Sequence, residues 1–390
     1  MSPPVMGLVR RNAYLVRTRM NSTSDFFILL KAGMWQKAEG SLSLTPDWEG
    51  IYTLANQQAV TGIVADGIVV MGLEQSVPQP IRDRFIADTS YITSTNLKTV
   101  AVQTRLCRMM EEAGICYVII KGQEAARNYP NPLLRVSGDI DVLLPQNHYE
   151  RAKELLLKIG TNPTDKSLAG EYSIYVDGIL VELHNNIYAG INAQCVNGFE
   201  ALARDVFSGR KRAVPDAGSD VPFVPSDDFN AIYLLVHAIR HLGSFGISLR
   251  QILDWVMHLS ARSGTINHAE LGRTIDALHL RNLYGLFAAF AREYLGASDE
   301  ALGASGGIVP GTHPATGELW SIIRRSGNFG CISPYAGKHF RSHIHERLYR
   351  TRFLLGQARE IKHIDDEFSR YLTRRVTADF FDSLRRTFTK

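Results

Sequence analysis

The chain is poor in cysteine, and its cysteines stand far apart. The four cysteines among 390 residues are Cys107, Cys116, Cys195 and Cys331, and no two of them form a Cys-x-x-Cys pair. This spacing is typical neither of a zinc-binding motif nor of a disulfide framework. Because reduced thiols are usual in the cytoplasm, we expect a cytoplasmic protein.

Long apolar runs, internal repeats and low-complexity tracts are missing as well. No run reaches the roughly 18 apolar residues of a membrane-spanning helix, so we expect no membrane span. The first 20 residues hold four arginines, no acidic residue and no apolar core, which argues against a secretory signal. We predict that residues 1–23 form a basic, disordered arm, with Met20 as an alternative start to Met1.

A strong charge of one sign is also absent, because the formal net charge is only +4. The charge is nevertheless uneven, since residues 338–390 contain 13 lysines and arginines but 7 acidic residues. Such a segment is either a solvated helical face or a contact surface for an acidic partner or a nucleotide. A nucleic-acid reader is the less favoured interpretation, because the core lacks a basic stripe interleaved with aromatic residues.

What is present is a change of periodicity along the chain, from helical to alternating and back to helical. We predict a helical region over residues 24–114, an α/β core over 115–225 and a helical domain with a basic tail over 226–390. Gly114 is the expected C-cap glycine of a long helix. In the first region, helices are predicted at residues 26–35, twice within 48–70, and at 79–113.

Four short strands with helices between them make the predicted core a small mixed sheet. The fold class is therefore α+β, with this sheet embedded in a mostly helical chain. Asp177-Gly178 is a strong signal for a hairpin turn. The predicted strands cover residues 115–120, 139–144, 172–176 and 179–185, and helices are predicted at 122–128, 148–159, 199–207, 229–241, 249–261, 269–278, 280–295 and from 342 onwards, with a loop at 296–317.

The clearest chemical signal is the stretch IIKGQEAARNYPNPLLRVSGDIDVLL, residues 119–144. Asp139 and Asp141 alternate on one predicted strand, so both carboxylates point to the same face. Two carboxylates this close repel one another unless a cation lies between them, and Mg²⁺ binds carboxylate oxygens together with substrate phosphates. Gly122, before a helix start, leaves room for a phosphate. The stretch therefore predicts a metal–nucleotide site.

The order of strand, glycine, helix and Asp-x-Asp strand resembles the DNA polymerase β-type nucleotidyltransferase superfamily. More narrowly, the pattern KGxxxAxxYPxPxLRxxGDID is similar to an uncharacterised nucleotidyltransferase family found in many bacteria, and the resemblance covers about residues 24–330. The chain departs from the superfamily at Gly122-Gln123, where Gly-Gly or Gly-Ser is usual, and in a longer gap to Asp139. Further positions that match the family are Glu182, His184, His237, His241 and Asp254-Trp255.

This resemblance implies an enzyme that moves a nucleoside monophosphate from an NTP, held with Mg²⁺ or Mn²⁺, to a hydroxyl acceptor and releases pyrophosphate. It implies Asp139, Asp141 and Glu182 as catalytic residues and metal ligands. Glu182 would complete a second metal site or take the proton of the nucleophile. The residues implied in nucleotide binding are Lys121, Gly122, Gln123, Arg135, Ser137, Gly138, His184, His237, Arg240 and His241.

Several of these residues have a second interpretation. Lys121 contacts a phosphate or merely extends its stem over apolar surface. Arg135 grips a phosphate or ties its loop to a carboxylate. His184 binds phosphate, transfers a proton or makes a structural hydrogen bond.

His237, Arg240 and His241 share one face of a predicted helix because they are three and four residues apart. This face closes the nucleotide site from the helical domain. Alternatively, the two histidines bind zinc or are partly buried structural residues. We expect Trp255 in the core.

The acceptor is open among a protein, a sugar, a small molecule and RNA, and the base of the NTP is open as well. The main alternative outside enzymes is a nucleotide-binding protein whose catalytic core has decayed. The intact set of Asp139, Asp141 and Glu182 argues against decay. Gln123, which departs from the usual Gly-Gly or Gly-Ser, leaves this alternative open.

Overall fold

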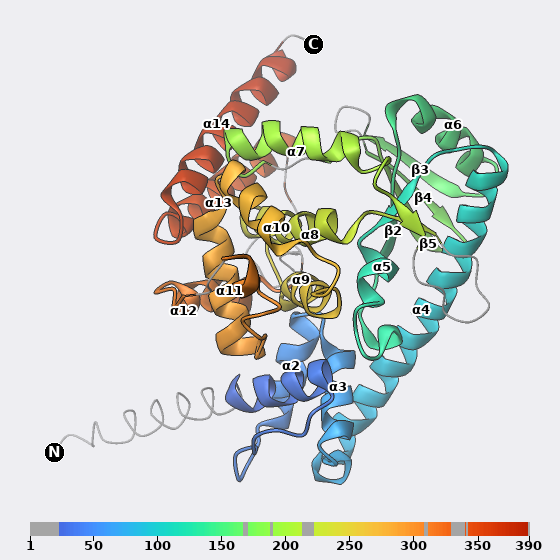
Figure 1. Ribbon diagram of the computed structural model, residues 1–390. Helices are drawn as coiled ribbons and strands as arrows, with labels where there is room; N and C mark the ends of the chain where they lie inside the picture. The colour runs from blue at the N-terminus through green and yellow to red at the C-terminus, as the bar shows by residue number, and fades with distance from the viewer. Residues whose placement is uncertain are drawn as a thin grey trace.

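The computed structural model describes residues 23–166, 171–187, 190–212, 222–307, 311–328, 340 and 342–388. It confirms the predicted α+β class, because a small five-stranded mixed sheet lies within a mostly helical chain (Figure 1). The predicted basic arm, apart from Thr23, lies outside the described residues.

The N-terminal helices follow the predicted periodicity. Residues 23–35 are helical, followed by α2 (Trp48–Gln57), α3 (Thr61–Val70), the short η1 (Glu74–Ser76) and the long α4 (Gln79–Glu112). Gly114 has a φ of +62°, a conformation suited to glycine just after a helix end. The predicted C-cap glycine is therefore confirmed.

The sheet has the strand order β1-β2-β5-β4-β3. Only β2 and β5 pair in parallel, and the other neighbouring strands are antiparallel. Asp177 and Gly178 both have positive φ and close the predicted hairpin between β4 and β5. The strands are β1 (Val118–Ile120), β2 (Asp139–Leu143), β3 (Thr161–Lys166), β4 (Glu171–Val176) and β5 (Ile179–His184), with α5 (Gly122–Ala126), η2 (Pro132–Leu134) and α6 (Gln146–Leu157) between them.

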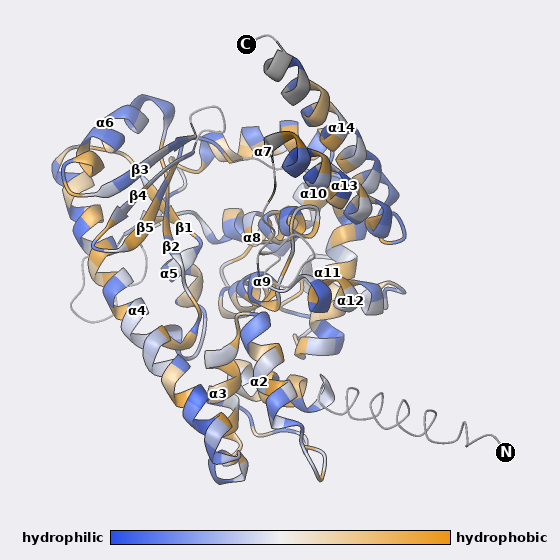
Figure 2. Cartoon of the chain, turned by 180° about the vertical axis from the view of Figure 1, so that it is seen from behind, coloured by the Kyte–Doolittle hydropathy of each residue, from blue (hydrophilic) through white to orange (hydrophobic). Residues whose placement is uncertain are grey.

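The sequence patterns do not predict β3, and its composition explains why. Its six residues, Thr161–Lys166, are polar and include a proline. Proline is tolerated on an edge strand because one side of that strand needs no donor. β3 lies at the edge of the sheet, where Figure 2 shows it mostly hydrophilic beside the more hydrophobic central strands.

The two faces of the sheet have different partners. Ile119, Ile140 and Val142 point to one face and form a buried cluster with Leu106 of α4 and Leu156 of α6. Val118, Ile120 and Leu143 alternate with them and belong to the core that the other helices build. Asp141 pairs with Ile120 on one side and with Glu182 on the other, so the predicted site residues share this second face.

The second face looks toward the C-terminal helices. The sheet lies between α4 and α6 on one side and the group containing α8 and α9 on the other (Figure 1). Residues 23–70 share a core with these C-terminal helices, and it is α4 that covers the sheet. The elements of this half are α7 (Ala193–Asp205), β6 (Lys211–Arg212), β7 (Phe223–Val224), α8 (Asp227–Leu242), α9 (Leu249–Ala261), α10 (His268–Ala277), α11 (Arg281–Leu295), η4 (Ala304–Gly306), α12 (Thr316–Ser326), α13 (His343–Ile361) and α14 (Asp366–Phe388).

A local signal sets the start of α8. The Ser226 hydroxyl accepts a hydrogen bond from the Phe229 amide at 3.2 Å, which makes Ser226 the N-cap. α12 is a helix that the sequence patterns do not predict.

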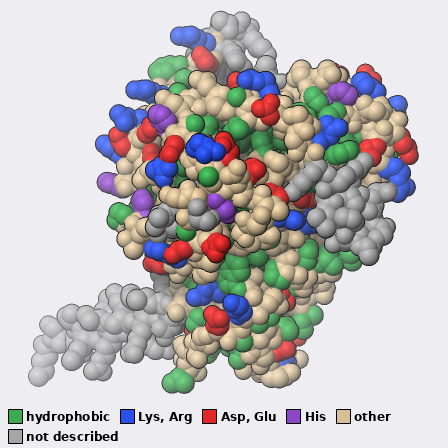
Figure 3. Space-filling model, viewed as in Figure 1, with side chains coloured by type: hydrophobic (Ala, Val, Ile, Leu, Met, Phe, Trp, Pro, Cys, Tyr) green, Lys and Arg blue, Asp and Glu red, His purple; other side chains and the backbone are tan. Residues whose placement is uncertain are grey.

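On the face in Figure 3, acidic side chains are interspersed with the basic ones, including over the basic C-terminal segment. In the described part of the chain, no helix combines the length and apolar character needed to cross a membrane.

Candidate active site

A large cleft separates the second face of the sheet from α8 and α9. Its volume is about 1070 Å³, just above the 300–1,000 Å³ usual for small-molecule sites. Ten residues predicted for the site line it, which means that strands and helices far apart in sequence meet there. They are Lys121, Gly122, Arg135, Asp139, Asp141, Glu182, His184, His237, Arg240 and His241.

Asp141 is the most deeply buried carboxylate of the cleft, with a side chain only 1% exposed. Its Oδ1 accepts from Lys121 Nζ at 2.7 Å and from His184 Nε2 at 2.9 Å. Burial alone would raise the pKa of Asp141, but the Lys121 ammonium and the His184 hydrogen bond lower it to about 2. Asp141 is thus ionised at neutral pH, and His184 Nε2 carries the proton of their hydrogen bond.

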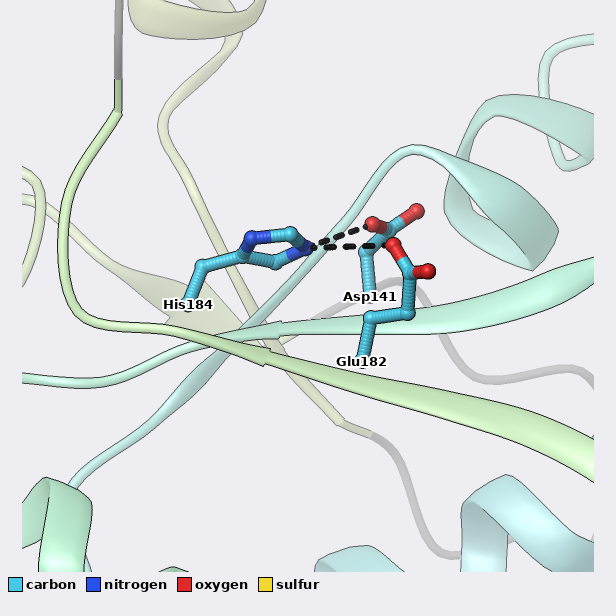
Figure 4. Close-up of side chains that lie close together, drawn as sticks. All are labelled: Asp141, Glu182 and His184. Carbon is cyan, nitrogen blue, oxygen red and sulfur yellow. Dashed lines mark hydrogen bonds and ion pairs between the residues drawn. The ribbon is translucent and has the colours of Figure 1, made fainter. Parts of the chain in front are cut away.

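Glu182 lies beside Asp141 because β2 and β5 pair in parallel with these two residues opposite one another. Glu182 Oε2 is 3.7 Å from His184 Nε2 (Figure 4). Burial, with the negative charges of Asp141 and Asp139, raises the pKa of Glu182 to about 7. A carboxylate under such repulsion is stabilised by a proton or by a cation.

Asp141, Glu182 and His184 form a group that can hold a metal ion. One ligand atom from each lies within 4.8 Å of the others. The expected set had Asp139 instead of His184. Asp139 lines the same cleft, and the charge of Asp141, followed by burial, raises its pKa. A role for Asp139 as a ligand stays a prediction.

The turn after β1 brings Lys121 onto Asp141. Lys121 has a φ of +57° and a ψ of −143°, a conformation that disfavours residues with a side chain. Gly122 follows with a φ of +44°, and a Cβ there would lie 3.1 Å from the Asp139 carbonyl oxygen. Close approach of the two strands therefore explains this glycine. The helix α5 behind it has only five residues, fewer than expected.

Arg135 ties its loop to the helical half. Its Nε and Nη2 donate to the two oxygens of Asp254 on α9, at 2.7 and 2.6 Å. The Tyr129 hydroxyl donates to the same carboxylate at 2.8 Å. Of the two interpretations of Arg135, the structure shows the tie to a carboxylate. Trp255 is fully buried, which confirms its predicted core position.

The α8 side of the cleft carries Tyr233, His237, Arg240 and His241. The two imidazoles lie together, with 3.2 Å between their Nε2 atoms. Burial and then the positive charge of Lys121 lower the pKa of both, that of His241 to about 3. They are neutral at neutral pH, so Arg240 alone brings positive charge from this face. In the described chain, no third metal-ligating side chain joins them.

Three residues predicted for nucleotide binding do not line the cleft. The Gln123 side chain is buried and donates to Asn96 of α4 at 2.9 Å. The Ser137 hydroxyl is buried and has no hydrogen-bond partner. Gly138 is exposed, and nothing lies within 4 Å of a Cβ placed on it. Only Gln123 is shown to be held away from the cleft by a distant partner, Asn96 of α4.

Tyr233 and Arg250 are two of the cleft residues that the sequence patterns do not predict. Tyr233 lies four residues before His237, so extending the spacing of the histidines by one turn would have found it. Arg250 is buried in the first turn of α9, where the positive end of the helix dipole disfavours a cation. Its Nη1 donates to the Val136 carbonyl at 3.2 Å, and its charge opposes the raised pKa of Asp139.

A family model described as an uncharacterised nucleotidyltransferase matches residues 45–296, about two thirds of the chain. The chain belongs to this nucleotidyltransferase family. The match begins before α2 and ends just after α11, so it includes every residue of the cleft. Among curated proteins, none matches the chain. Membership confirms the resemblance drawn from the motif and assigns the chain to a family of transferases.

Proposed function

We propose that this protein is a metal-dependent nucleotidyltransferase that moves a nucleoside monophosphate from an NTP to a hydroxyl acceptor and releases pyrophosphate. One observation carries the proposal: the carboxylates of Asp141 and Glu182 on the sheet face a wall of α8 and α9 that bears Arg240 and Arg250. An NTP bound with a metal ion needs acidic ligands for the metal and cationic groups for the phosphates, and this cleft offers both.

The donor set fits a divalent cation. Two carboxylates, with Asp139 as a further oxygen donor, suit Mg²⁺ or Mn²⁺. The imidazole of His184 suits Mn²⁺ better than Mg²⁺, and it can join them only in the tautomer whose Nε2 carries no proton. Asp141 is already ionised, as a ligand must be. When bound, the metal supplies charge stabilisation to the phosphoryl oxygens and lowers the pKa of a hydroxyl placed on it.

The step forms one bond and breaks one. An acceptor oxygen bonds to the α-phosphorus, while the bond from this phosphorus to the bridging oxygen of pyrophosphate breaks. The hydroxyl proton needs a base nearby. Glu182 fits this role by its position, because it lies beside Asp141 in the same cleft. Lys121, Arg240 and Arg250 stabilise the negative charge on the leaving pyrophosphate.

The cleft has room for an acceptor beyond the triphosphate. Past the strand β5 it continues to Glu171 at the start of β4, to Glu200 of α7 and to Asn185. The strand order places Glu171 on the side of Glu182 away from Lys121. The acceptor would enter from this end, with its hydroxyl near Glu182. Protein, sugar, small-molecule and RNA acceptors all remain within the proposal.

The test is transfer of label from each of the four α-³²P-labelled NTPs, with Mg²⁺ or Mn²⁺ and an extract of the source cells. Label on one acceptor, with release of pyrophosphate, is the expected result. It should be lost with Asp141→Asn and Glu182→Gln. A matched control is Asp165→Asn, which changes an acid paired with Lys153 on the surface.

Transfer that persists in both variants would contradict the proposed site. Metal-dependent NTP binding without label on any acceptor would instead favour the alternative, a nucleotide-binding protein whose catalysis has decayed.

A further inference from the structure

Lys121 occupies the place of a cation in the candidate metal group. Its Nζ lies 2.7 Å from Asp141 Oδ1, and the Lys121 side chain is only 17% exposed. The same oxygen also accepts from His184 at 2.9 Å. Oδ1 therefore has both lone pairs in use, and a metal ion that binds Asp141 through this oxygen must replace one of the two donors.

The backbone shows that the side chain at position 121 is retained against a conformational cost. A φ of +57° with a ψ of −143° suits glycine far better than lysine. Structure elsewhere must offset this cost, and the ion pair to Asp141 is the strong contact that only the lysine side chain supplies here. A purely structural turn would be better served by glycine.

The ammonium also faces the other wall of the cleft. Lys121 and Tyr233 of α8 line the same cleft, and Asp139 of the sheet lines it as well. The group therefore stands between the acidic sheet and the helical side, where the triphosphate is proposed to bind. A lysine stem has four rotatable bonds, so its head can move by several ångströms without a backbone change.

We propose that Lys121 is an exchangeable counter-ion of the metal site. With the cleft empty, it neutralises Asp141. When a metal ion arrives with a triphosphate, the metal replaces the ammonium at Asp141, and the ammonium pairs with a phosphate oxygen. This inference rests on the proposed function, because it assigns to Lys121 a role in the binding of the metal–nucleotide complex.

The exchange makes metal and triphosphate bind together. A metal ion alone must displace the ammonium and leave it in the cleft without a partner, so it binds weakly. A metal ion with a triphosphate offers the ammonium a new partner, so it binds more tightly. The two ligands are then positively coupled, and coupling of this kind is reciprocal. The enzyme thereby avoids holding a metal ion in the absence of substrate.

The test compares binding of Mn²⁺ alone with binding of Mn²⁺–tripolyphosphate, which represents the triphosphate without a base. Free Mn²⁺ is measured by electron paramagnetic resonance, and the complex by water-proton relaxation. Lys121→Met removes the charge and keeps the stem. It should bind Mn²⁺ alone at least about tenfold more tightly than the wild type, because one opposite charge changes a carboxylate's proton affinity by about 10- to 1,000-fold. It should bind Mn²⁺–tripolyphosphate more weakly.

These opposite changes in one variant are the signature of exchange, because a damaged site would weaken both ligands. Arg240→Met removes a charge from the α8 side of the same cleft and should weaken only the tripolyphosphate complex. Lys153→Met, a change at a lysine paired with Asp165 away from the cleft, should alter neither. Lys121→Gln serves as a second neutral variant if Lys121→Met does not fold.

Each other outcome overturns a defined claim. Wild-type binding of Mn²⁺–tripolyphosphate, together with unchanged or weaker Mn²⁺ affinity in both folded Lys121 variants, overturns the exchange and leaves the proposed function standing. Absence of wild-type binding to Mn²⁺–tripolyphosphate overturns the proposed function and the exchange together.

Discussion

The two walls of the cleft are built in different ways. The sheet wall takes its acids from two neighbouring strands, whose parallel register places Asp141 opposite Glu182. The helical wall takes Arg240 from the end of α8 and Arg250 from the start of α9, and only packing brings them to the same cleft. Backbone hydrogen bonds therefore position the acids, whereas the packing of two helices positions the cations.

A buried ion pair joins the motif loop to the helical wall. Arg135 reaches from the loop before β2 to Asp254 on α9, and both side chains are less than 10% exposed. This comparison predicts that substitutions in the two walls, and in the contact that joins them, affect different properties of the protein. Changes on the sheet should stop chemistry, changes at the joint should cost stability, and changes on the helical wall should weaken substrate binding.

The largest effect is expected from the sheet wall. Asp141→Asn removes a proposed ligand and the partner of Lys121, and we expect label transfer to fall about 1,000-fold or more, the equivalent of about 4 kcal/mol in the barrier. The rate of pyrophosphate release measures it. Asp165→Asn, on the surface, should retain the wild-type rate. A variant Asp141→Asn with more than a tenth of that rate would show that this carboxylate holds no essential group.

The second-largest effect is expected from the joint, the ion pair between Arg135 and Asp254. Asp254→Asn leaves the buried guanidinium of Arg135 without its counter-charge, which costs about 3–5 kcal/mol in the free energy of unfolding. Urea denaturation measures the loss. Glu270→Gln breaks an exposed pair with Arg273 and should change the same free energy by no more than about 0.5 kcal/mol. Equal effects of the two variants would contradict the importance of burial at the joint.

The helical wall should show a difference between charged and neutral groups. Arg240→Ala should weaken Mn²⁺–tripolyphosphate binding about tenfold, because it removes a charge-assisted contact. His241→Ala should weaken Mn²⁺–tripolyphosphate binding no more than about threefold, because the lowered pKa leaves this imidazole neutral. Neither change should alter binding of Mn²⁺ alone. A larger loss from His241→Ala than from Arg240→Ala would reverse this assignment.

The same two histidines predict a pH dependence of stability. Their pKa values are lowered in the folded protein, so below about pH 6.5 the unfolded chain binds more protons than the folded one. Stability is therefore complete above about pH 6.5 and falls as the pH drops, by up to about 1.4 kcal/mol per pH unit for each imidazole.

Melting of the double variant His237→Gln and His241→Gln between pH 7 and pH 5 measures this effect. The melting temperature of this double variant should fall less between pH 7 and pH 5 than that of the wild type. The melting temperature of His363→Gln, a change at an exposed histidine, should fall as much as that of the wild type. Identical slopes in all three proteins would mean that the two imidazoles become protonated in the folded state.

The smallest effect concerns Asp139. Its carboxylate is repelled by Asp141, so Asp139→Asn should raise the free energy of unfolding of the metal-free protein by up to about 1 kcal/mol. Chemical denaturation without divalent metal measures it. Asp141→Asn should move the same free energy in the opposite direction, because it strands Lys121. A loss of stability in both variants would indicate that Asp139 has an attractive partner.

The sequence predicts the acids of the sheet wall and the residues His237, Arg240 and His241 of the helical wall, but it does not predict Arg250 of α9. Asp139, Asp141 and Glu182 follow from local alternation and from the family pattern, because strand geometry fixes which side chains share a face. The hairpin at Asp177-Gly178 and the N-cap Ser226 are equally local. Gln123 shows the limit, because its partner Asn96 lies 27 residues away on α4.

Arg250 and β3 show the same limit in other ways. Arg250 sits against the dipole of its own helix, and only the approach of α9 to the sheet gives it a role. β3 is polar and contains a proline, so it depends on pairing with β4 for its conformation. Residues whose place depends on one distant contact could not be predicted from periodicity.

The most direct measurement of the central claim is an anomalous difference map from a crystal that holds Mn²⁺ and tripolyphosphate. The account predicts a Mn²⁺ peak in coordination distance of the carboxylates of Asp141 and Glu182, with the tripolyphosphate between that peak and Arg240 of α8. A Mn²⁺ peak away from Asp141, or a tripolyphosphate bound outside the cleft between the sheet and α8, would contradict it.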